Sequence, residues 1–105
     1  MPEIRTDASI QTVICTFDVT PGTAEDVVEA LNDAYAAVIS RQPGFIAAAV
    51  HVNDAQTRIA TYSQWRARSD YQAMLRTPEM RERNRAIHAM CRSFEPVMYE
   101  VVATY

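Results

Sequence analysis

The sequence contains no lysine, because all ten basic residues among its 105 residues are arginine. A catalytic Schiff base needs a lysine amine, so mechanisms that form one, including covalent attachment of pyridoxal phosphate, are excluded. Positive charge is also scarce overall. The formal net charge is -3, which argues against non-specific binding to nucleic acid.

Long apolar runs are missing as well. No run approaches the ~20 residues that a membrane span needs. The first residues, Met1 to Gln11, are polar and acidic and lack the apolar core of a signal peptide. We therefore expect a cytoplasmic protein without a membrane partner.

Side chains that bind metals are few and scattered. The two cysteines, Cys15 and Cys91, lie far apart without the spacing of a metal site, and the two histidines, His51 and His88, are isolated. A closed zinc site is therefore not expected. In a reducing compartment, we expect both cysteines to be buried small hydrophobes.

The residues that are present suit a single globular domain. A hydrophobic content of 49% argues against disorder, and we assign residues 1–9 to an N-terminal arm and 10–105 to the domain. Alternation predicts strands over 10–19, 45–52, 57–65 and 94–103, with a turn at 53–56. Helices are expected from Thr23 to about Arg41, from a capping box of Ser69 and Gln72, and from Pro78 to about Arg92.

This order predicts an α+β fold of the ferredoxin-like βαββαβ type, with a four-stranded antiparallel sheet and helices on one face. The opposite sheet face is also expected to be apolar and to need a cover that the chain does not supply. A second copy would cover it, so we expect a homodimer through the sheet faces. The residues that carry this argument are Ile46, Val50, Val52, Met98 and Val102.

A pocket is predicted between the helices and the middle strands. Four short side chains would face the helices there, where a tight core would need larger ones. His51 and Trp65 are expected on the same side, and Tyr71 and Arg85 could close the roof. An apolar cavity with a few polar groups is the usual form of a small-ligand site. The four short side chains are those of Ala47, Ala49, Thr61 and Ser63.

Each of these residues also has a purely structural interpretation. Trp65 alone is compatible with a core or interface aromatic residue, and His51 at a strand end with a solvated histidine. A helix stripe at spacings of four, three and four is compatible with a solvated face. Its members are Arg81, Arg85, His88 and Arg92. From the residues alone, the prediction is a binding pocket.

Several segments of the chain resemble the antibiotic biosynthesis monooxygenase family, and in particular the small quinone-forming oxygenases of aromatic polyketide pathways. The resemblance covers about residues 10–103, and its more specific parts are the Pro-Gly-Phe turn and the Tyr-x-Gln-Trp strand end. The segments are Pro43-Gly44-Phe45, His51-Val52 and Tyr62-Ser63-Gln64-Trp65-Arg66, followed by Tyr71 and Met74-Leu75.

The resemblance implies a dimeric α+β barrel that oxidises a phenolic, anthrone-like polycycle to a quinone with O2 and without metal, flavin or haem. It implies that Trp65 orients the ring system, that Tyr71 and Arg85 hold phenolate or peroxide oxygens, and that His51 carries the proton. Thr61 stands where quinone-forming members commonly have asparagine. The implied substrate-binding set is Phe45, Ala47, Ala49, Thr61, Ser63, Trp65 and Met74.

Two other functions are compatible with the same fold. One is a non-oxidative role as a cyclase, an isomerase or a ligand-binding accessory protein, which Thr61 makes more credible than asparagine would. The other is a haem-binding or haem-degrading protein, for which His88 is the candidate axial ligand.

Overall fold

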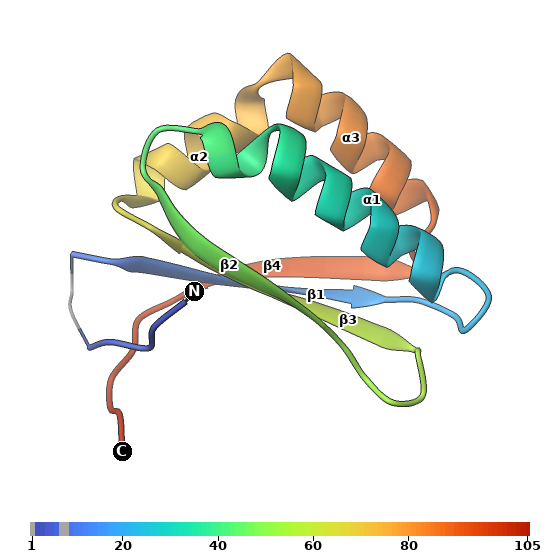
Figure 1. The fold of residues 1–105 in the computed structure, drawn as a ribbon, viewed down its shortest axis with the longest axis horizontal. Coiled ribbons are helices and arrows are strands. Elements are labelled where there is room, and N and C mark those ends of the chain that lie inside the picture. The colour runs from blue at the N-terminus through green and yellow to red at the C-terminus, as the bar shows by residue number, and fades with distance from the viewer. Residues whose placement is uncertain (1, 7–8) are drawn as a thin grey trace.

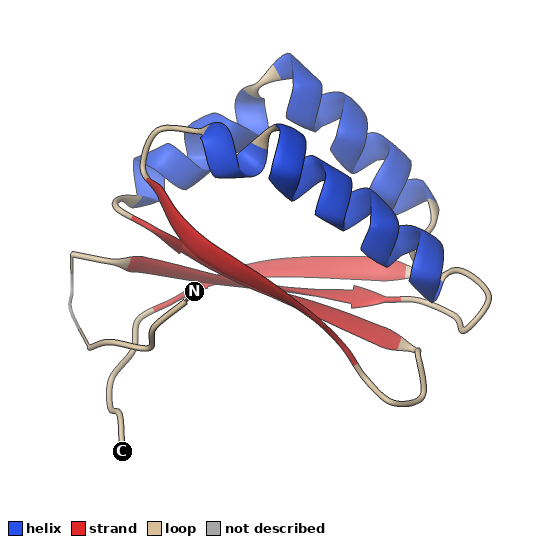
Figure 2. Cartoon of the chain, in the orientation of Figure 1, coloured by secondary structure: helices blue, strands red, loops and turns tan. Residues whose placement is uncertain are grey.

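The computed structural model describes residues 2–6 and 9–105. Its four strands form one antiparallel sheet in the order β2-β3-β1-β4, and the helices cover one face of it (Figures 1 and 2). The predicted α+β, ferredoxin-like fold is confirmed. The strands are β1 (Gln11–Asp18), β2 (Phe45–Val52), β3 (Arg58–Trp65) and β4 (Ser93–Tyr99), and the helices are α1 (Ala24–Ala37), α2 (Arg68–Arg76) and α3 (Pro78–Ala89), with a 3-10 turn, η1 (Ile39–Arg41), after α1.

The core lies between the sheet and the helices. Strand β1 contributes Val13 and Phe17, whereas α1 contributes Val27, Leu31 and Ala34, all of them buried. The helix residues recur at the spacing that places side chains on one face of an α-helix. None of the helices in the described part of the chain is long and apolar enough to cross a membrane.

Three of the expected helix boundaries differ from the structure. Helix α1 ends at Ala37 rather than near Arg41, and the 3-10 turn η1 follows it. The predicted capping box of Ser69 and Gln72 is wrong, because α2 begins at Arg68, with Ala67 at the N-cap and no side-chain cap. Helix α3 ends at Ala89 rather than near Arg92. Its expected start is confirmed: Pro78 is the first helical residue, and the Thr77 hydroxyl accepts a hydrogen bond from the Met80 amide at 3.3 Å.

A β-bulge interrupts the register between β2 and β3. Phe45 pairs with Trp65, but the next regular pair joins Ala47 to Gln64, so Ile46 is an extra residue in β2. Because side chains alternate along a strand, a shift of one residue moves every later side chain to the other sheet face.

The bulge overturns part of the predicted pocket. Strand β3 presents Thr61 and Ser63 to the helices, and their partners in β2 are Val50 and Ala48. The prediction that Ala47 and Ala49 share this face is wrong, because the alternation from Phe45 onward was assumed to be unbroken. His51 is displaced to the outer face for the same reason, paired with Ala60.

The side chains on the outer sheet face also differ from those on which the dimer prediction is based. Val50 and Val52 pair with Thr61 and Ile59, and Met98 pairs with Val13, so these three apolar residues lie on the helix side. The outer face is instead a mixture of small, apolar and polar side chains. Its residues are Thr12, Ile14, Thr16, Ala47, Ala49, His51, Ala60, Tyr62, Gln64, Glu95, Val97 and Tyr99.

The N-terminal segment, residues 2–6, runs on this outer side of the sheet (Figure 1). The Gln64 side-chain amide donates a hydrogen bond to the Glu3 carbonyl. This contact ties the arm to the C-terminal end of β3.

Candidate active site

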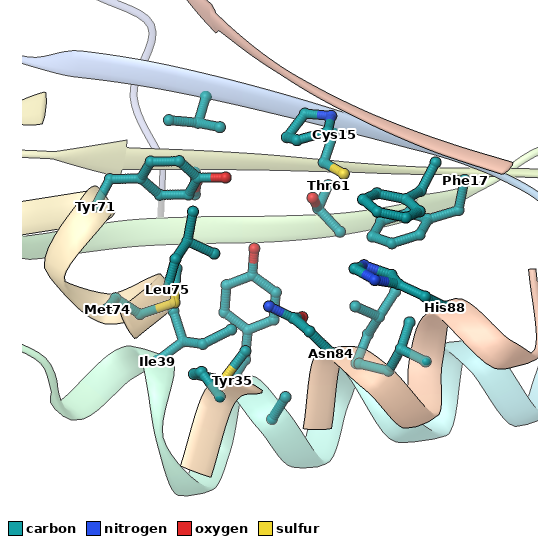
Figure 3. Close-up of a pocket in the computed structure, with 18 residues that line it drawn as sticks. Cys15, Phe17, Tyr35, Ile39, Thr61, Tyr71, Met74, Leu75, Asn84 and His88 are labelled. Carbon is teal, nitrogen blue, oxygen red and sulfur yellow. The ribbon is translucent and has the colours of Figure 1, made fainter. Parts of the chain in front are cut away.

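A cavity of about 210 Å³ lies between the helices and strands β1, β3 and β4 (Figure 3). Most of its wall is apolar, as is usual for small-ligand sites. Strands β1 and β3 and all three α-helices also contribute a polar side chain or a thiol to it. These are Cys15 from β1, Tyr35 from α1, Thr61 and Ser63 from β3, Tyr71 from α2, and Asn84 and His88 from α3.

A chain of hydrogen bonds crosses the sheet side of the cavity. The Trp65 indole Nε1–H donates to the Ser63 hydroxyl at 3.1 Å, and the Tyr35 hydroxyl is hydrogen-bonded to the side chains of Ser63 and Thr61. Because an indole N–H can only donate, the Ser63 oxygen accepts from Trp65 and its own hydrogen is free for Tyr35. The chain therefore fixes the Tyr35 oxygen beside Thr61, where Figure 3 shows the two side chains facing one another.

The acidic groups of this wall are protonated at neutral pH. Burial raises the pKa of the Tyr71 phenol to about 12 and that of the Cys15 thiol to about 12. Burial also raises the pKa of Tyr35, although its hydrogen bonds to Thr61 and Ser63 partly offset the effect. Each of these phenols therefore carries a proton that it can donate in a hydrogen bond.

Trp65 supports the cavity wall from behind. It is fully buried and packs edge-on against Phe45 at 5.4 Å and against Tyr71 at 5.8 Å between ring centroids. This cluster holds the Tyr71 ring in place because edge-to-face aromatic pairs favour defined orientations.

His88 forms the opposite end of the cavity. Its imidazole stacks on the Phe94 ring with 3.4 Å between centroids and 9° between planes. Burial lowers the pKa of His88 below its ordinary value of 6.5. The imidazole is therefore neutral at neutral pH.

The sequence matches the family model for antibiotic biosynthesis monooxygenases over residues 10–86. The chain belongs to this family. No curated protein sequence matches it significantly, but solved structures of antibiotic biosynthesis monooxygenases and related proteins share its fold.

Three of these structures cover nearly the whole chain. The monooxygenase ActVA-Orf6 of Streptomyces coelicolor, solved with the ligand nanaomycin D, is 22% identical with a TM-score of 0.82 and covers 94% of each chain. A variant of SnoaB, a cofactor-independent oxygenase of Streptomyces nogalater, is 19% identical with a TM-score of 0.81 and covers 92% of this chain and 97% of that one. PA3566 of Pseudomonas aeruginosa is 20% identical with a TM-score of 0.76, covering 91% and 97%.

In this member of the family, the cavity brings together only part of the residue set predicted from sequence. Thr61, Ser63, Tyr71 and Met74 line it, and Trp65 lies behind its wall. A separate, shallow hollow of about 620 Å³ runs along the free edge of β2 and contains the rest of the predicted substrate-binding set. Those residues are Phe45, Ala47 and Ala49.

Two predicted catalytic residues lie outside the cavity. His51 is exposed on the outer sheet face, where its Nδ1 is 3.2 Å from the Ala60 carbonyl oxygen. Arg85 is exposed on α3, and the cavity wall does not include it, so the prediction that it closes the roof is wrong. The helix turns about 100° per residue, so the cavity-facing positions are Asn84 and His88 instead.

Sequence reasoning missed Tyr35 and Asn84 as site residues. Both belong to helix stripes that read as apolar core, in which they are the polar members. A polar side chain within a buried stripe needs a partner or a ligand, and this signal could have identified them.

Proposed function

We propose that this protein is a cofactor-independent monooxygenase that oxidises a phenolic polycycle of the anthrone type to a quinone with O2. The observation that carries the proposal is the mostly apolar cavity in which protonated hydroxyl donors converge on one side. Membership of the monooxygenase family supports it. So do the cofactor-independent oxygenase SnoaB and the ligand-bound ActVA-Orf6 among proteins of the same fold.

The reaction needs no reductant other than the substrate. Loss of a proton from the ring methylene gives an electron-rich anion, whose carbon forms a bond with O2. The resulting hydroperoxide loses water. One oxygen atom of O2 becomes the new carbonyl oxygen, and the other leaves in that water molecule.

The cavity residues have distinct tasks in this proposal. Tyr71 and one hydroxyl of the hydrogen-bonded Tyr35–Thr61 pair donate hydrogen bonds to the oxygen that becomes negative, which lowers the barrier because the donors are fixed beforehand. Trp65 positions Tyr71. The apolar wall, including Met74, encloses the flat rings and keeps bulk water from the anion.

The size of the cavity favours a small ligand. At about 210 Å³, it is below the roughly 300–1,000 Å³ of pockets for drug-sized ligands. That volume suits two or three fused rings better than a tetrapyrrole, which makes the haem-related alternative less favoured, although His88 does lie in the cavity wall.

We also propose a homodimer through the outer sheet face. The support is different from the residues that first suggested it. Ile14, Ala49 and Val97 form a partly buried apolar surface there. A partner subunit would cover the apolar surface of Ile14, Ala49 and Val97.

Oxygen consumption with an anthrone-type phenol such as dithranol tests the enzymatic proposal. We expect uptake that is insensitive to chelators, and a product that has gained one oxygen and lost two hydrogens by mass spectrometry. A product of unchanged mass would instead indicate the cyclase or isomerase alternative. Absence of uptake with every such phenol would refute the oxygenase.

A further inference from the structure

We propose that His88 is the catalytic base of the cavity, the group that removes the proton from the substrate. This inference rests on the proposed oxygenase function and assigns to His88 the role that the family resemblance implies for His51. Of the two histidines in the chain, His88 lines the cavity, whereas His51 lies on the other face of the sheet.

The chemistry of the wall leaves His88 as the suitable proton acceptor. The cavity lining contains no aspartate or glutamate among the described residues. Cys15, Tyr35 and Tyr71 hold their protons because burial raises their pKa values, so none of them is an anion at neutral pH. Asn84 does not titrate. A neutral imidazole is the remaining base, and bases with a pKa near the working pH are efficient.

The stacking of His88 on Phe94 suits this role. Stacking occupies a face of the imidazole, whereas both nitrogens lie on the ring edge and stay available for proton transfer. No hydrogen bond within residues 2–6 and 9–105 engages either nitrogen. Once the ring is protonated, the Phe94 face also stabilises its charge through a cation–π interaction.

The surroundings of His88 also favour release of a proton from its imidazolium form. Besides His88, the titratable side chains in the cavity wall are Cys15 from β1, Tyr35 from α1 and Tyr71 from α2, and Cys91 lies two residues after α3. All four are neutral acids, because burial also raises the pKa of Cys91, and β4 presents Phe94 and Pro96 there. The carboxylates of the surrounding elements, among them Asp18, Asp70 and Glu95, do not line the cavity. Without a carboxylate to hold it, an imidazolium at this position is a good donor.

These properties define a balanced proton cycle. His88 accepts the first methylene proton and returns it to the peroxide anion that forms when O2 adds to the carbon. It then accepts the second proton from the same carbon as the O–O bond breaks and the carbonyl forms. The departing hydroxide takes this proton from His88 and leaves as water.

The test separates proton removal from oxygenation. Dithranol is mixed with the protein without oxygen, and the absorbance of the substrate anion is followed, with oxygen uptake measured in parallel. We expect His88→Gln to slow anion formation and turnover by at least ~100-fold, the lower end for general bases. His51→Gln is the matched control and should behave as wild type. Added imidazole should partly restore the rate in His88→Ala.

The outcomes distinguish the two proposals. If the wild-type protein forms the substrate anion but takes up no oxygen, the oxygenase proposal is refuted. The role of His88 as the base is still supported in that case if His88→Gln abolishes anion formation. Wild-type rates in folded His88→Gln overturn the role of His88 and leave the oxygenase intact. If His88→Gln does not fold, ¹⁵N NMR of the wild-type imidazole decides: anaerobic binding of dithranol must protonate the ring, and an unchanged neutral ring overturns the inference.

Discussion

The Tyr71 hydroxyl is a hydrogen-bond donor whose position in the cavity is fixed by packing. Its ring is held by Trp65, and its pKa of about 12 keeps the proton in place. The donor is therefore both oriented and protonated before a ligand arrives, which is the condition under which donors stabilise a developing anion most.

Replacing Tyr71 by phenylalanine removes the donor and keeps the ring that packs on Trp65. We expect kcat/KM for oxygen-dependent turnover of dithranol to fall about 10- to 100-fold, equivalent to roughly 1.4–2.7 kcal/mol of barrier. Arg85→Gln is the matched control, because Arg85 is exposed and outside the cavity. A Tyr71→Phe enzyme with wild-type kinetics would remove Tyr71 from the machinery, and a slow Arg85→Gln enzyme would contradict the geometry.

The pH dependence of turnover reports on His88. Only the neutral imidazole accepts a proton, so the rate must fall as the pH decreases through the pKa of His88, which burial places below 6.5. In His88→Gln this acid limb should vanish from the pH profile of the residual activity. An identical limb in the variant would assign it to another group.

At the scale of elements, Gly44, the residue before β2, packs closely against Asp70 in the first turn of α2. Gly44 has a φ of 83°, and a Cβ at this position would lie 2.5 Å or less from the Asp70 side chain, including its Cβ. The Gly44 carbonyl also accepts a hydrogen bond from the Arg66 amide at 2.8 Å. The start of β2 is thereby locked against the end of β3 and the first turn of α2, which carries Tyr71.

Gly44→Ala should therefore lower the free energy of unfolding by at least about 1 kcal/mol, from both the left-handed backbone and the steric clash. Gly22→Ala is the control, because the nearest atom to its added Cβ is the Thr20 hydroxyl at an ordinary 3.8 Å. Urea unfolding followed by circular dichroism compares the two. Equal stability of both variants would show that the junction tolerates a side chain.

The elements themselves could be predicted from sequence, because each follows from local periodicity and turn residues. The register of β2 could not. An unbroken alternation from Phe45 and one broken at Ile46 differ only in tertiary packing, and Phe45 satisfies its part of the pattern by meeting Trp65 in both cases. The same register shift explains why the predicted site places Ala47, Ala49 and His51 on the wrong face of the sheet. The predicted site was correct for Thr61 and Ser63, whose strand is regular.

At the scale of the whole molecule, the helices cover one face of the sheet, whereas residues 2–6 and the C-terminal tail run on the other side (Figure 1). The apolar surface of Ile14, Ala49 and Val97 on that face distinguishes a monomer from the proposed dimer. A charge placed there keeps its contact with water in a monomer, whereas a dimer would desolvate it, which weakens association.

We expect Val97→Asp to raise the dimer dissociation constant, measured by sedimentation equilibrium, at least about tenfold, which corresponds to roughly 1.4 kcal/mol. Arg85→Gln serves as the control, because Arg85 is exposed on α3, away from the outer sheet face. An unchanged dissociation constant in Val97→Asp would mean that the interface does not include this surface. A protein that stays monomeric at all concentrations would contradict the dimer.

Because Trp65 is enclosed in the core, its intrinsic fluorescence also reports on the state of the molecule. The chain has no other tryptophan, and this one is sealed from solvent against Tyr71, directly behind the cavity wall. Its fluorescence emission should be blue-shifted in the folded protein and should move to the red when the core opens. A ligand that displaces Tyr71 should change its intensity. Occupancy and unfolding can therefore be followed in the unmodified protein, without a label and without knowing the natural substrate.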